Sequence, residues 1–366
     1  MKNSIGTSVI LTLAGESHGE MIVAVLDGMA SGIPVSEEII AARLSLRRPS
    51  GAADTARREP DRFRIVSGVF NGCTTGAPVC ILIPNENVRS ADYERSHLLA
   101  RPSHADYVAH VRYGGFEDWR GGGHFSGRIT AGIVAAGAIA AEALRRKGIT
   151  VGTHILSCAG VQDAPFSDVD ASALKREIET VSAMDFPVLT GCREAMEARI
   201  MEAKADGDSV GGVVQTAVCG LPAGVGEPWF SSLEGVIANA VLSIGGIKGI
   251  EFGAGFSLAG MRGSEANDAF CMQDGAVRTS TNRSGGINGG ISNGMPLIFN
   301  AVVKPTPSIS KPQQTVDMDT QSPATLQVTG RHDPAIVRRV CIVVSSLVAI
   351  VLCDQLAQRF GTDYLK

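Results

Sequence analysis

The sequence predicts an α+β fold in which antiparallel strands pack together with buried helices. Strand-like segments recur in pairs joined by short turns, helices and strands interleave along the chain, and two long helical segments are mostly apolar. The 366 residues include 44% apolar side chains, which is enough for a large core, and no repeat or linker divides them. We therefore expect a single domain that spans residues 1–366.

In the N-terminal half, apolar patterning predicts strands and a capping residue predicts where a helix begins. The expected strands are residues 7–13, residues 21–27 and two strands within 65–83 that are joined at Asn71-Gly72. Ser36 is a suitable N-cap for a helix over Glu37–Leu46, which carries acids in its first turn. Residues 47–64 and 85–127 are polar and are expected to be loops.

In the C-terminal half, small and apolar residues dominate the expected helices. Thr130–Lys147 is apolar on nearly every face and stops at Gly148, so it should be buried. The last helix should begin at Asp333-Pro334, an N-cap followed by proline, and run to about Phe360. The remaining expected elements are helices at 171–182, 191–205 and 230–244, strands at 210–218 and 297–303, and a turn and strand at 245–260.

Composition and charge exclude several classes of protein. A formal net charge of −4 does not indicate a nucleic-acid-binding protein. The eight Cys form no C-x-x-C pair, as expected of reduced thiols in a cytosolic protein. The N-terminus has no apolar signal core, and Ile129–Leu144 and Cys341–Cys353 are shorter than the ~20 residues of a membrane span. We therefore expect a cytoplasmic protein with no membrane or nucleic-acid partner.

An arginine-rich loop is the first indication of a binding site. Residues 43–64 contain seven Arg, three acids and no Lys. Because a guanidinium group matches the planar geometry of phosphate and carboxylate, the loop indicates a site for an anionic small molecule. The alternative is a charged loop that only contacts solvent.

Two glycine-rich segments could bring backbone amides to a ligand. Gly121–Arg128 leads directly into a buried helix, whose N-terminus favours an anion. Its spacing differs from the dinucleotide-binding fingerprint, and no strand is expected before it. Asn282–Gly294 is a second such loop. The alternatives are a turn that caps a helix and a mobile surface loop.

Several polar groups in these loops could transfer protons. His18, His104, His110, His124 and His332 lie in polar loops, and His18 and His104 lie in motifs bounded by Gly or Pro. Lys304–Ser308 presents an ammonium group and two hydroxyls, and Thr329–Pro334 combines a cation, an imidazole and a carboxylate. No His or Cys spacing indicates a metal site.

Taken in order along the chain, these segments resemble the chorismate synthase family. The motifs are Gly15-Glu16-Ser17-His18-Gly19, Arg47-Arg48-Pro49, Arg101-Pro102-Ser103-His104-Ala105-Asp106-Tyr107, Gly121–Arg128, Lys304–Ser308 and Gly330-Arg331-His332-Asp333-Pro334. They span residues 6 to about 357, and six motifs in one order are far more specific than any one of them.

The resemblance implies both a fold and a reaction. The family fold is a β-α-β sandwich of antiparallel sheets around helices, assembled as a homotetramer. Its members eliminate phosphate from 5-enolpyruvylshikimate-3-phosphate in an anti-1,4 sense to give chorismate, and they require reduced FMN although no net redox change occurs. The protein's contribution would be positioning and electrostatic stabilisation.

The resemblance also assigns roles to individual residues. The implied catalytic residues are His18, an acid near the leaving phosphate, His104, which steadies charge on the reduced flavin, and Asp333, which assists proton movement. The implied substrate clamp is Arg47, Arg48, Arg128 and Arg331. The implied flavin contacts are His124, Phe125, Ser126, Gly245, Gly246, Gly289, Lys304, Pro305, Thr306, Pro307, Ser308 and Arg331.

Departures from the family pattern affect the expected source of electrons. Ser50–Ala56 lacks an arginine that many relatives carry and contains Asp54, which should weaken binding of the 2′-phosphate of NADPH. We therefore expect reduced FMN to come from outside, for example from a separate flavin reductase, with direct reduction by NADPH as the alternative. Gly245-Gly246 also replaces bulkier residues, and His124 stands where many relatives have Arg.

Two other functions remain open from the sequence. A different flavin enzyme, such as an FMN reductase, would share anion-binding loops but would consume NAD(P)H. A polyanion- or RNA-binding protein would use the arginine loop together with stacking aromatics, yet the chain has only two Trp and four Tyr.

Overall fold

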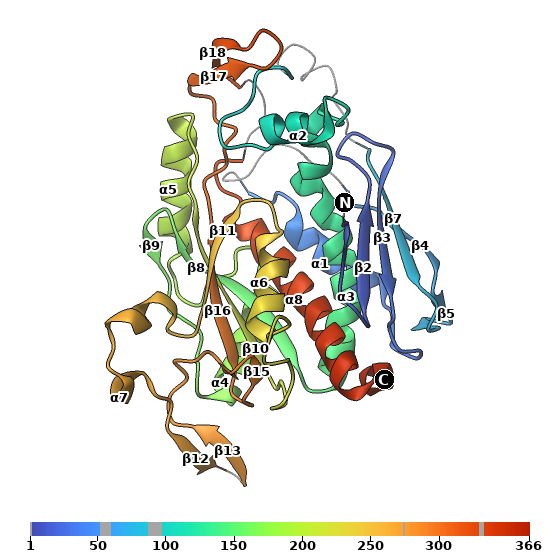
Figure 1. Cartoon of the computed structure of the whole chain (residues 1–366), viewed down its shortest axis with the longest axis vertical. Helices are drawn as coiled ribbons and strands as arrows, with labels where there is room; N and C mark the ends of the chain where they lie inside the picture. The colour runs from blue at the N-terminus through green and yellow to red at the C-terminus, as the bar shows by residue number, and fades with distance from the viewer. Residues whose placement is uncertain (1, 52–59, 87–96, 274, 329–332) are drawn as a thin grey trace.

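Two antiparallel sheets enclose a layer of helices, so the predicted α+β sandwich is confirmed (Figure 1). The structure is a computed structural model that describes residues 2–51, 60–86, 97–273, 275–328 and 333–366. Each sheet has five strands, and every pair of neighbouring strands within it is antiparallel.

The first sheet is formed by the N-terminal quarter of the chain. Its strands, in spatial order, are β1 (Ser4–Ile5), β2 (Ile10–Ala14), β3 (Met21–Asp27), β7 (Val79–Pro84) and β4 (Arg64–Ser67). The predicted turn at Asn71-Gly72 joins the short strands β5 (Val69–Phe70) and β6 (Cys73–Thr74). Both turn residues have positive φ, as the tightest hairpin turn requires.

The second sheet draws its strands from the C-terminal two thirds of the chain. In spatial order they are β11 (Ile247–Phe252), β16 (Leu297–Val303), β10 (Gly212–Cys219), β8 (Thr150–Cys158) and β9 (Val161–Gln162). The sequence did not predict β8, although it is an internal strand. Its alternation is obscured by His154, which is fully buried. The ring nitrogens of His154 lie within hydrogen-bond distance of two acceptors, Oδ2 of Asp163 and Oε1 of Gln215.

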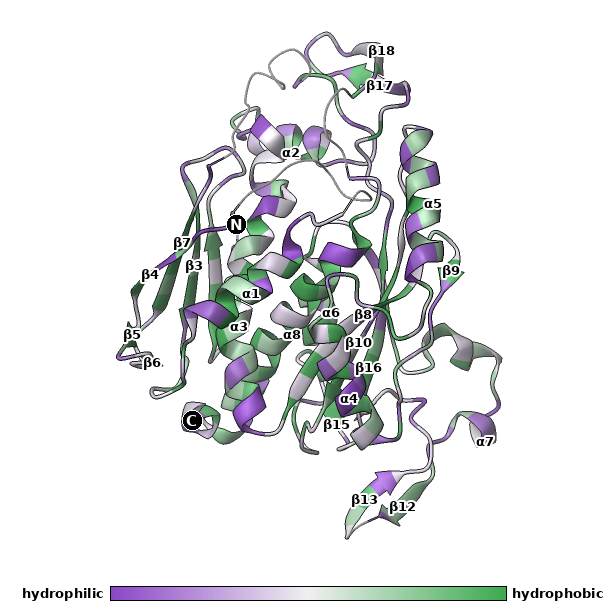
Figure 2. Ribbon diagram, turned by 180° about the vertical axis from the view of Figure 1, so that it is seen from behind, coloured by the Kyte–Doolittle hydropathy of each residue, from purple (hydrophilic) through white to green (hydrophobic). Residues whose placement is uncertain are grey.

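The helices between the sheets form the hydrophobic core. They are α1 (Glu37–Arg47), α3 (Thr130–Arg146), α6 (Leu233–Leu242) and α8 (Val337–Phe360), and Figure 2 shows the largely hydrophobic character of α3 and α8. A Cβ added to Gly137 would lie 2.4 Å from Cβ of Ser346, so α3 and α8 cross at a point where only glycine fits. By length and composition α8 could span a membrane, but its apolar window is 100% buried inside the protein.

The remaining elements lie outside this sandwich. α4 (Ala171–Ser182) covers the outer face of the second sheet through a smaller apolar cluster, and α2 (Asp106–Tyr113) lies at the upper end in Figure 1. The others are α5 (Arg193–Ala205), α7 (Gly263–Ala266), β12 (Phe270–Gln273), β13 (Ala276–Thr279), β14 (Ile287–Asn288), β15 (Ile291–Ser292), β17 (Gln313–Asp317) and β18 (Ser322–Leu326).

One predicted boundary is wrong and bears on a site residue. α8 begins at Val337 and not directly after Asp333, because the carbonyl of Pro334 accepts a hydrogen bond from the amide of Val210 at 2.8 Å. Pro334 is therefore hydrogen-bonded to the segment that leads into β10. Asp333 forms an ion pair with Arg339 and does not cap this helix.

Candidate active site

Loops from both sheets and from the segment before α3 meet at the upper end of the sandwich in Figure 1. The turn over residues 15–20 joins β2 to β3, and the amide of Ser17 donates to the carbonyl of Gly123 at 3.0 Å. Nδ1–H of His124 donates to the carbonyl of Gly15 at 2.8 Å. These two bonds fix the glycine-rich segment against the turn that carries His18.

The imidazole of His18 packs directly on the backbone of Gly121. The residue is only 8% exposed, and a Cβ added to Gly121 would lie 2.6 Å from its Nε2 atom and 2.9 Å from Oγ of Ser17. Gly121 also has a φ of +60°, which favours glycine. Glycine at this position therefore allows the backbone of the segment to lie against the side chains of His18 and Ser17.

His104 faces the next glycine and is oriented by a carboxylate. A Cβ on Gly122 would lie 3.4 Å from Cε1 of His104. Nδ1 of the same ring lies 2.6 Å from Oδ1 of Asp106, which also accepts a hydrogen bond from Nη2 of Arg101 at 2.7 Å. Burial alone would raise the pKa of Asp106, but the hydrogen bonds from Arg101 and His104 outweigh it and hold the pKa well below its ordinary value.

The depressed pKa of Asp106 gives a pH-dependent contribution to stability. Because the carboxyl pKa is lower in the folded than in the unfolded protein, this stabilisation is complete above the unfolded value of about 3.9 and decreases as the pH falls below it. We expect Asp106→Asn to lower the free energy of unfolding by about 1–3 kcal/mol at pH 7. Urea midpoints measured from pH 7 to pH 3 should show this difference shrinking below pH 4, and a constant difference would contradict it.

Three predicted substrate-binding arginines converge on one buried acid. Arg47 contacts Asp61 at 2.9 Å, Arg128 forms an ion pair with it, and Nε of Arg48 lies 3.7 Å from it. Asn85 accepts a hydrogen bond from Nε of Arg128 at 2.8 Å. Burial lowers the pKa of Arg47, Asp61 opposes this, and the charges of Arg128 and Arg339 lower it further. The cluster therefore holds more positive than negative charge.

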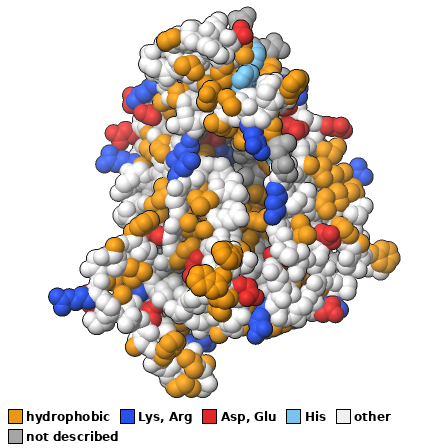
Figure 3. Space-filling view, viewed as in Figure 1, with side chains coloured by type: hydrophobic (Ala, Val, Ile, Leu, Met, Phe, Trp, Pro, Cys, Tyr) orange, Lys and Arg blue, Asp and Glu red, His pale blue; other side chains and the backbone are white. Residues whose placement is uncertain are grey.

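Several enclosed polar atoms in this region have no hydrogen bond to another described residue. They are Nε of Arg47, Arg48 and Arg339, Oγ of Ser17, and Oγ1 of Thr306. Buried donors are normally hydrogen-bonded, so each such atom needs an explanation. Their grouping around the arginine cluster and the glycine segment is what a site for an anionic ligand would produce. Figure 3 shows Lys and Arg side chains bordering the hollowed part of this face.

Most residues predicted to contact a cofactor are also brought together here. The carbonyl of Phe125 lies 4.0 Å from a Cβ added to Gly245, and the carbonyl of Gly246 accepts from the amide of Lys304 at 2.9 Å. Nζ of Lys304 in turn donates to the carbonyl of Ser103, beside His104. Oγ of Ser126 accepts from the amide of Arg128, and Pro305, Thr306, Pro307 and Ser308 continue from Lys304.

Two predicted residues are not placed with the others. Gly289 lies in the β14–β15 hairpin next to the start of α6, since Gly290 accepts from the amide of Leu233, whereas Gly245-Gly246 follow the end of that helix. Arg331 lies outside the described residues. Asp333 is near the arginine cluster, because its partner Arg339 acts on the pKa of Arg47.

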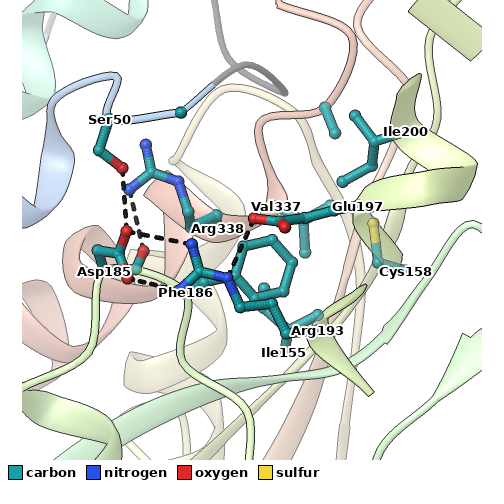
Figure 4. Close-up of a pocket in the computed structure, with 12 residues that line it drawn as sticks. Ser50, Ile155, Cys158, Asp185, Phe186, Arg193, Glu197, Ile200, Val337 and Arg338 are labelled. Carbon is teal, nitrogen blue, oxygen red and sulfur yellow. Dashed lines mark hydrogen bonds and ion pairs between the residues drawn. The ribbon is translucent and has the colours of Figure 1, made fainter. Parts of the chain in front are cut away.

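The C-terminal end of α1 is supported from behind by Arg338. Its guanidinium group donates to the carbonyls of Arg48 at 2.8 Å and Asp185 at 2.9 Å. Figure 4 shows the adjoining pocket, where the described acids Asp185 and Glu197 both pair with Arg193. Because these charges already neutralise one another, the pocket offers less to an anionic ligand than the arginine cluster does.

Sequence reasoning missed four residues that organise the site. Asp61, Asn85, Arg101 and Asp106 each hold a predicted residue in place. Asp106 had a visible signal, because it stands two residues after His104 in the same motif. Asn85 had none, since its partner Arg128 is 43 residues away. Within the described residues, no group of three His, Cys, Asp or Glu could hold a metal ion.

Comparison with known proteins relates this chain to one enzyme family. The family model described as chorismate synthase matches residues 9–357. A chorismate synthase of Methanocella arvoryzae is 43% identical over 97% of this chain and 94% of its own, and one of Dehalococcoides mccartyi is 45% identical over 99% and 98%. A crystal structure of chorismate synthase superimposes with a TM-score of 0.77 at 28% identity, covering 99% of this chain and 96% of that one.

Proposed function

The chain belongs to the chorismate synthase family, and we propose that the residues gathered at the upper end of the sandwich bind reduced FMN beside the substrate. The enzyme is a carbon–oxygen lyase of the shikimate pathway that removes phosphate from 5-enolpyruvylshikimate-3-phosphate to give chorismate. One observation carries the proposal for the site: the adjacent glycines Gly121 and Gly122 lie against His18 and His104 respectively.

The arginine cluster suits the three anionic groups of this substrate, a phosphate and two carboxylates. Nε of Arg47 and Nε of Arg48 are enclosed donors with no hydrogen bond among the described residues, although Nε of Arg48 lies 3.7 Å from Asp61. Both arginines can therefore bind an anion without losing an existing hydrogen bond at Nε. Arg339 offers a third such donor. The side chain of Arg128 is only 3% exposed, so we assign it to the base of the site, and Arg331 remains a proposed member of the clamp.

His18 is the proposed acid for the leaving phosphate. It is mostly enclosed, and the hydroxyl of Ser17 beside it has no described partner and could donate to the same group. An acid held in an enclosed, glycine-lined site can deliver a proton to the bridging oxygen as the C–O bond breaks. Asp333, paired with Arg339, is the proposed proton carrier on the cofactor side.

The remaining polar groups fit a flavin. Reduced FMN, when bound, supplies electron density to the substrate and accepts the hydrogen that the substrate loses. Lys304 and the unpaired hydroxyl of Thr306 can bind its phosphate and ribityl chain, and Gly245-Gly246 leaves room near Phe125. His104, held between ionised Asp106 and Gly122, can steady negative charge on the ring.

A spectral titration tests the proposed pairing of cofactor and substrate. Because the two ligands would share one enclosed site, FMN should bind at least about tenfold more tightly when 5-enolpyruvylshikimate-3-phosphate is present. The flavin absorbance should also shift. An FMN dissociation constant that is the same with and without the substrate would contradict a shared site. Strong consumption of NAD(P)H without substrate would favour a flavin reductase.

The clamp predicts different effects for two arginines of the same loop. Arg48 touches the buried cluster, whereas the side chain of Arg62 is 78% exposed and lies 3.9 Å from Glu86. We expect Arg48→Ala to raise KM for the substrate by about tenfold or more, since it removes a charge-assisted contact. Arg62→Ala should change KM by less than about twofold. Equal effects would mean that the loop acts only as diffuse positive charge.

We further propose that the enzyme receives reduced FMN from an external reductant or flavin reductase. The supporting segment, Ser50–Ala56, lies mostly outside the described residues, so the argument rests on its composition. Pure protein given oxidised FMN, substrate and NADPH without oxygen should form little chorismate. Sustained product at the rate obtained with chemically reduced FMN would show instead that NADPH serves as a substrate.

We propose a cytoplasmic homotetramer. All eight cysteines are free thiols, which suits a reducing compartment. Exposed apolar side chains on the projecting β12–β13 hairpin, Phe270 and Met272, and at Phe256 are suited to contacts between subunits.

A further inference from the structure

Asp61 places a negative charge at the centre of a site that should attract anions. Its side chain is fully enclosed, and it is shared by Arg47, Arg48 and Arg128. Arg47 and Arg48 come from the C-terminal end of α1, and Arg128 from the turn before α3. A single carboxylate thus joins cations from two parts of the chain.

Attraction of an anionic substrate gives no reason for an acid at this position. Asp61 cancels part of the positive charge and repels the anionic groups of a substrate. However, guanidinium groups bind phosphate and carboxylate through directed hydrogen bonds, so their orientation matters as much as their charge. Three enclosed cations also repel one another and would separate without a shared counter-ion.

The exposure of the three arginines shows how the cluster is built. Their side chains are 3% exposed for Arg128, 10% for Arg47 and 34% for Arg48. Arg128 and Asp61 therefore form the enclosed base, and Arg48 reaches furthest towards the open side. Asp61 holds Arg47 through Nη2, and Nε of Arg47 has no described hydrogen-bond partner, so Arg47 keeps a donor for a ligand. Arg48 faces Asp61 through its Nε at 3.7 Å, which is too far for a hydrogen bond.

We infer that Asp61 is a positioning residue for substrate binding, which fixes the guanidinium groups of Arg47, Arg48 and Arg128 in the arrangement that receives the substrate's anions. This inference rests on the substrate site proposed above. On this inference, the acid in the basic loop orients the guanidinium groups, which is a different role from neutralising charge or keeping the protein soluble.

The variant Asp61→Asn tests the inference through the sign of a change. If Asp61 positions the arginines, KM for 5-enolpyruvylshikimate-3-phosphate should rise by about tenfold or more, with kcat changed less than about threefold. If Asp61 only screens charge, KM should fall, because the site gains one positive charge. A lower or unchanged KM overturns the inference.

Glu86→Gln is the matched control for net charge. It makes the same change of one charge close to Asn85, but Glu86 is exposed and its ion-pair partner is the exposed Arg62. KM should stay the same or fall slightly in this variant. A rise in KM equal to that of Asp61→Asn would mean that the effect is not specific to the buried carboxylate, and would also overturn the inference.

Two further variants keep the result interpretable. Asp61→Glu retains the charge but moves the carboxylate by about one methylene group, so KM should rise about three- to tenfold in a protein that still folds. If Asp61→Asn does not fold, an unchanged KM in Asp61→Glu is enough to reject the inference. Arg48→Ala in the same assay distinguishes failure of the inference about Asp61 from failure of the proposed substrate site. An unchanged KM in Arg48→Ala rejects the substrate site itself.

Discussion

Replacing His18 by alanine is expected to lower kcat by about 10²- to 10⁴-fold, the usual contribution of a general acid. His18 is enclosed at the turn between β2 and β3, and its ring packs on the backbone of Gly121. Without it, no imidazole at this position can protonate the leaving phosphate. Binding of reduced FMN should change less than in a variant of His104, because the role proposed for His18 is at the phosphate of the substrate.

A nearby histidine provides the control for this variant. His97 stacks on Trp119 at 4.4 Å between ring centroids, close in the chain to His104 but without a proposed role. His97→Ala should keep kcat within about threefold of the native enzyme. If His18→Ala retains near-native turnover, or if both variants lose activity equally, His18 is not the acid. Circular dichroism would confirm that each variant is folded.

Replacing His104 by alanine is expected to lower kcat by about 10²- to 10³-fold and, unlike His18→Ala, to weaken binding of reduced FMN. His104 is held by Asp106 at 2.6 Å and faces Gly122, so it presents a fixed and polarised imidazole to the site. Oxidised FMN, which carries less negative charge on its ring, should bind with nearly unchanged affinity.

This difference between the two redox states is the decisive readout. Dissociation constants for reduced FMN are measured anaerobically by fluorescence or absorbance and compared with those for oxidised FMN. His110→Ala is the control, since the side chain of His110 is 39% exposed on α2 and its Nδ1 lies 3.3 Å from Oε1 of Glu117. Equal weakening of both redox states in His104→Ala would indicate a role in shaping the site without a specific role in steadying charge.

Local patterns in the sequence predicted much of the sandwich. β3 and α4 have the bounds expected from apolar alternation and from helical periodicity, and Ser36 and Asp170 accept amide hydrogen bonds as N-caps of α1 and α4. Signals of this kind depend on neighbouring residues, so they are readable without a structure.

Elements that depend on residues distant in the chain could not be predicted from local sequence patterns. The polar residues of β8 are satisfied by β10 and by Asp163, and the start of α8 is set by a hydrogen bond from Val210. Pairing of the strands, and hence the order of each sheet, also joins residues far apart in the chain. Tertiary contacts overrode the local preference in these places.

The candidate site shows the same division. The motifs identified His18, His104 and the arginines because each motif is local. The tasks of Asp61 and Asn85 depend on Arg128, which is 67 and 43 residues away from them. Only the folded chain shows that a carboxylate lies among the arginines, and that Gly121 and Gly122 contact two different histidines.

The most direct test of the account is the reaction itself. Pure protein should be mixed without oxygen with 5-enolpyruvylshikimate-3-phosphate and chemically reduced FMN, and chorismate and phosphate should be measured against time. We expect equal amounts of both products, turnover by FMN in catalytic quantity, and no product when only oxidised FMN is present. Product formation without any flavin, or no product with reduced FMN, would contradict it.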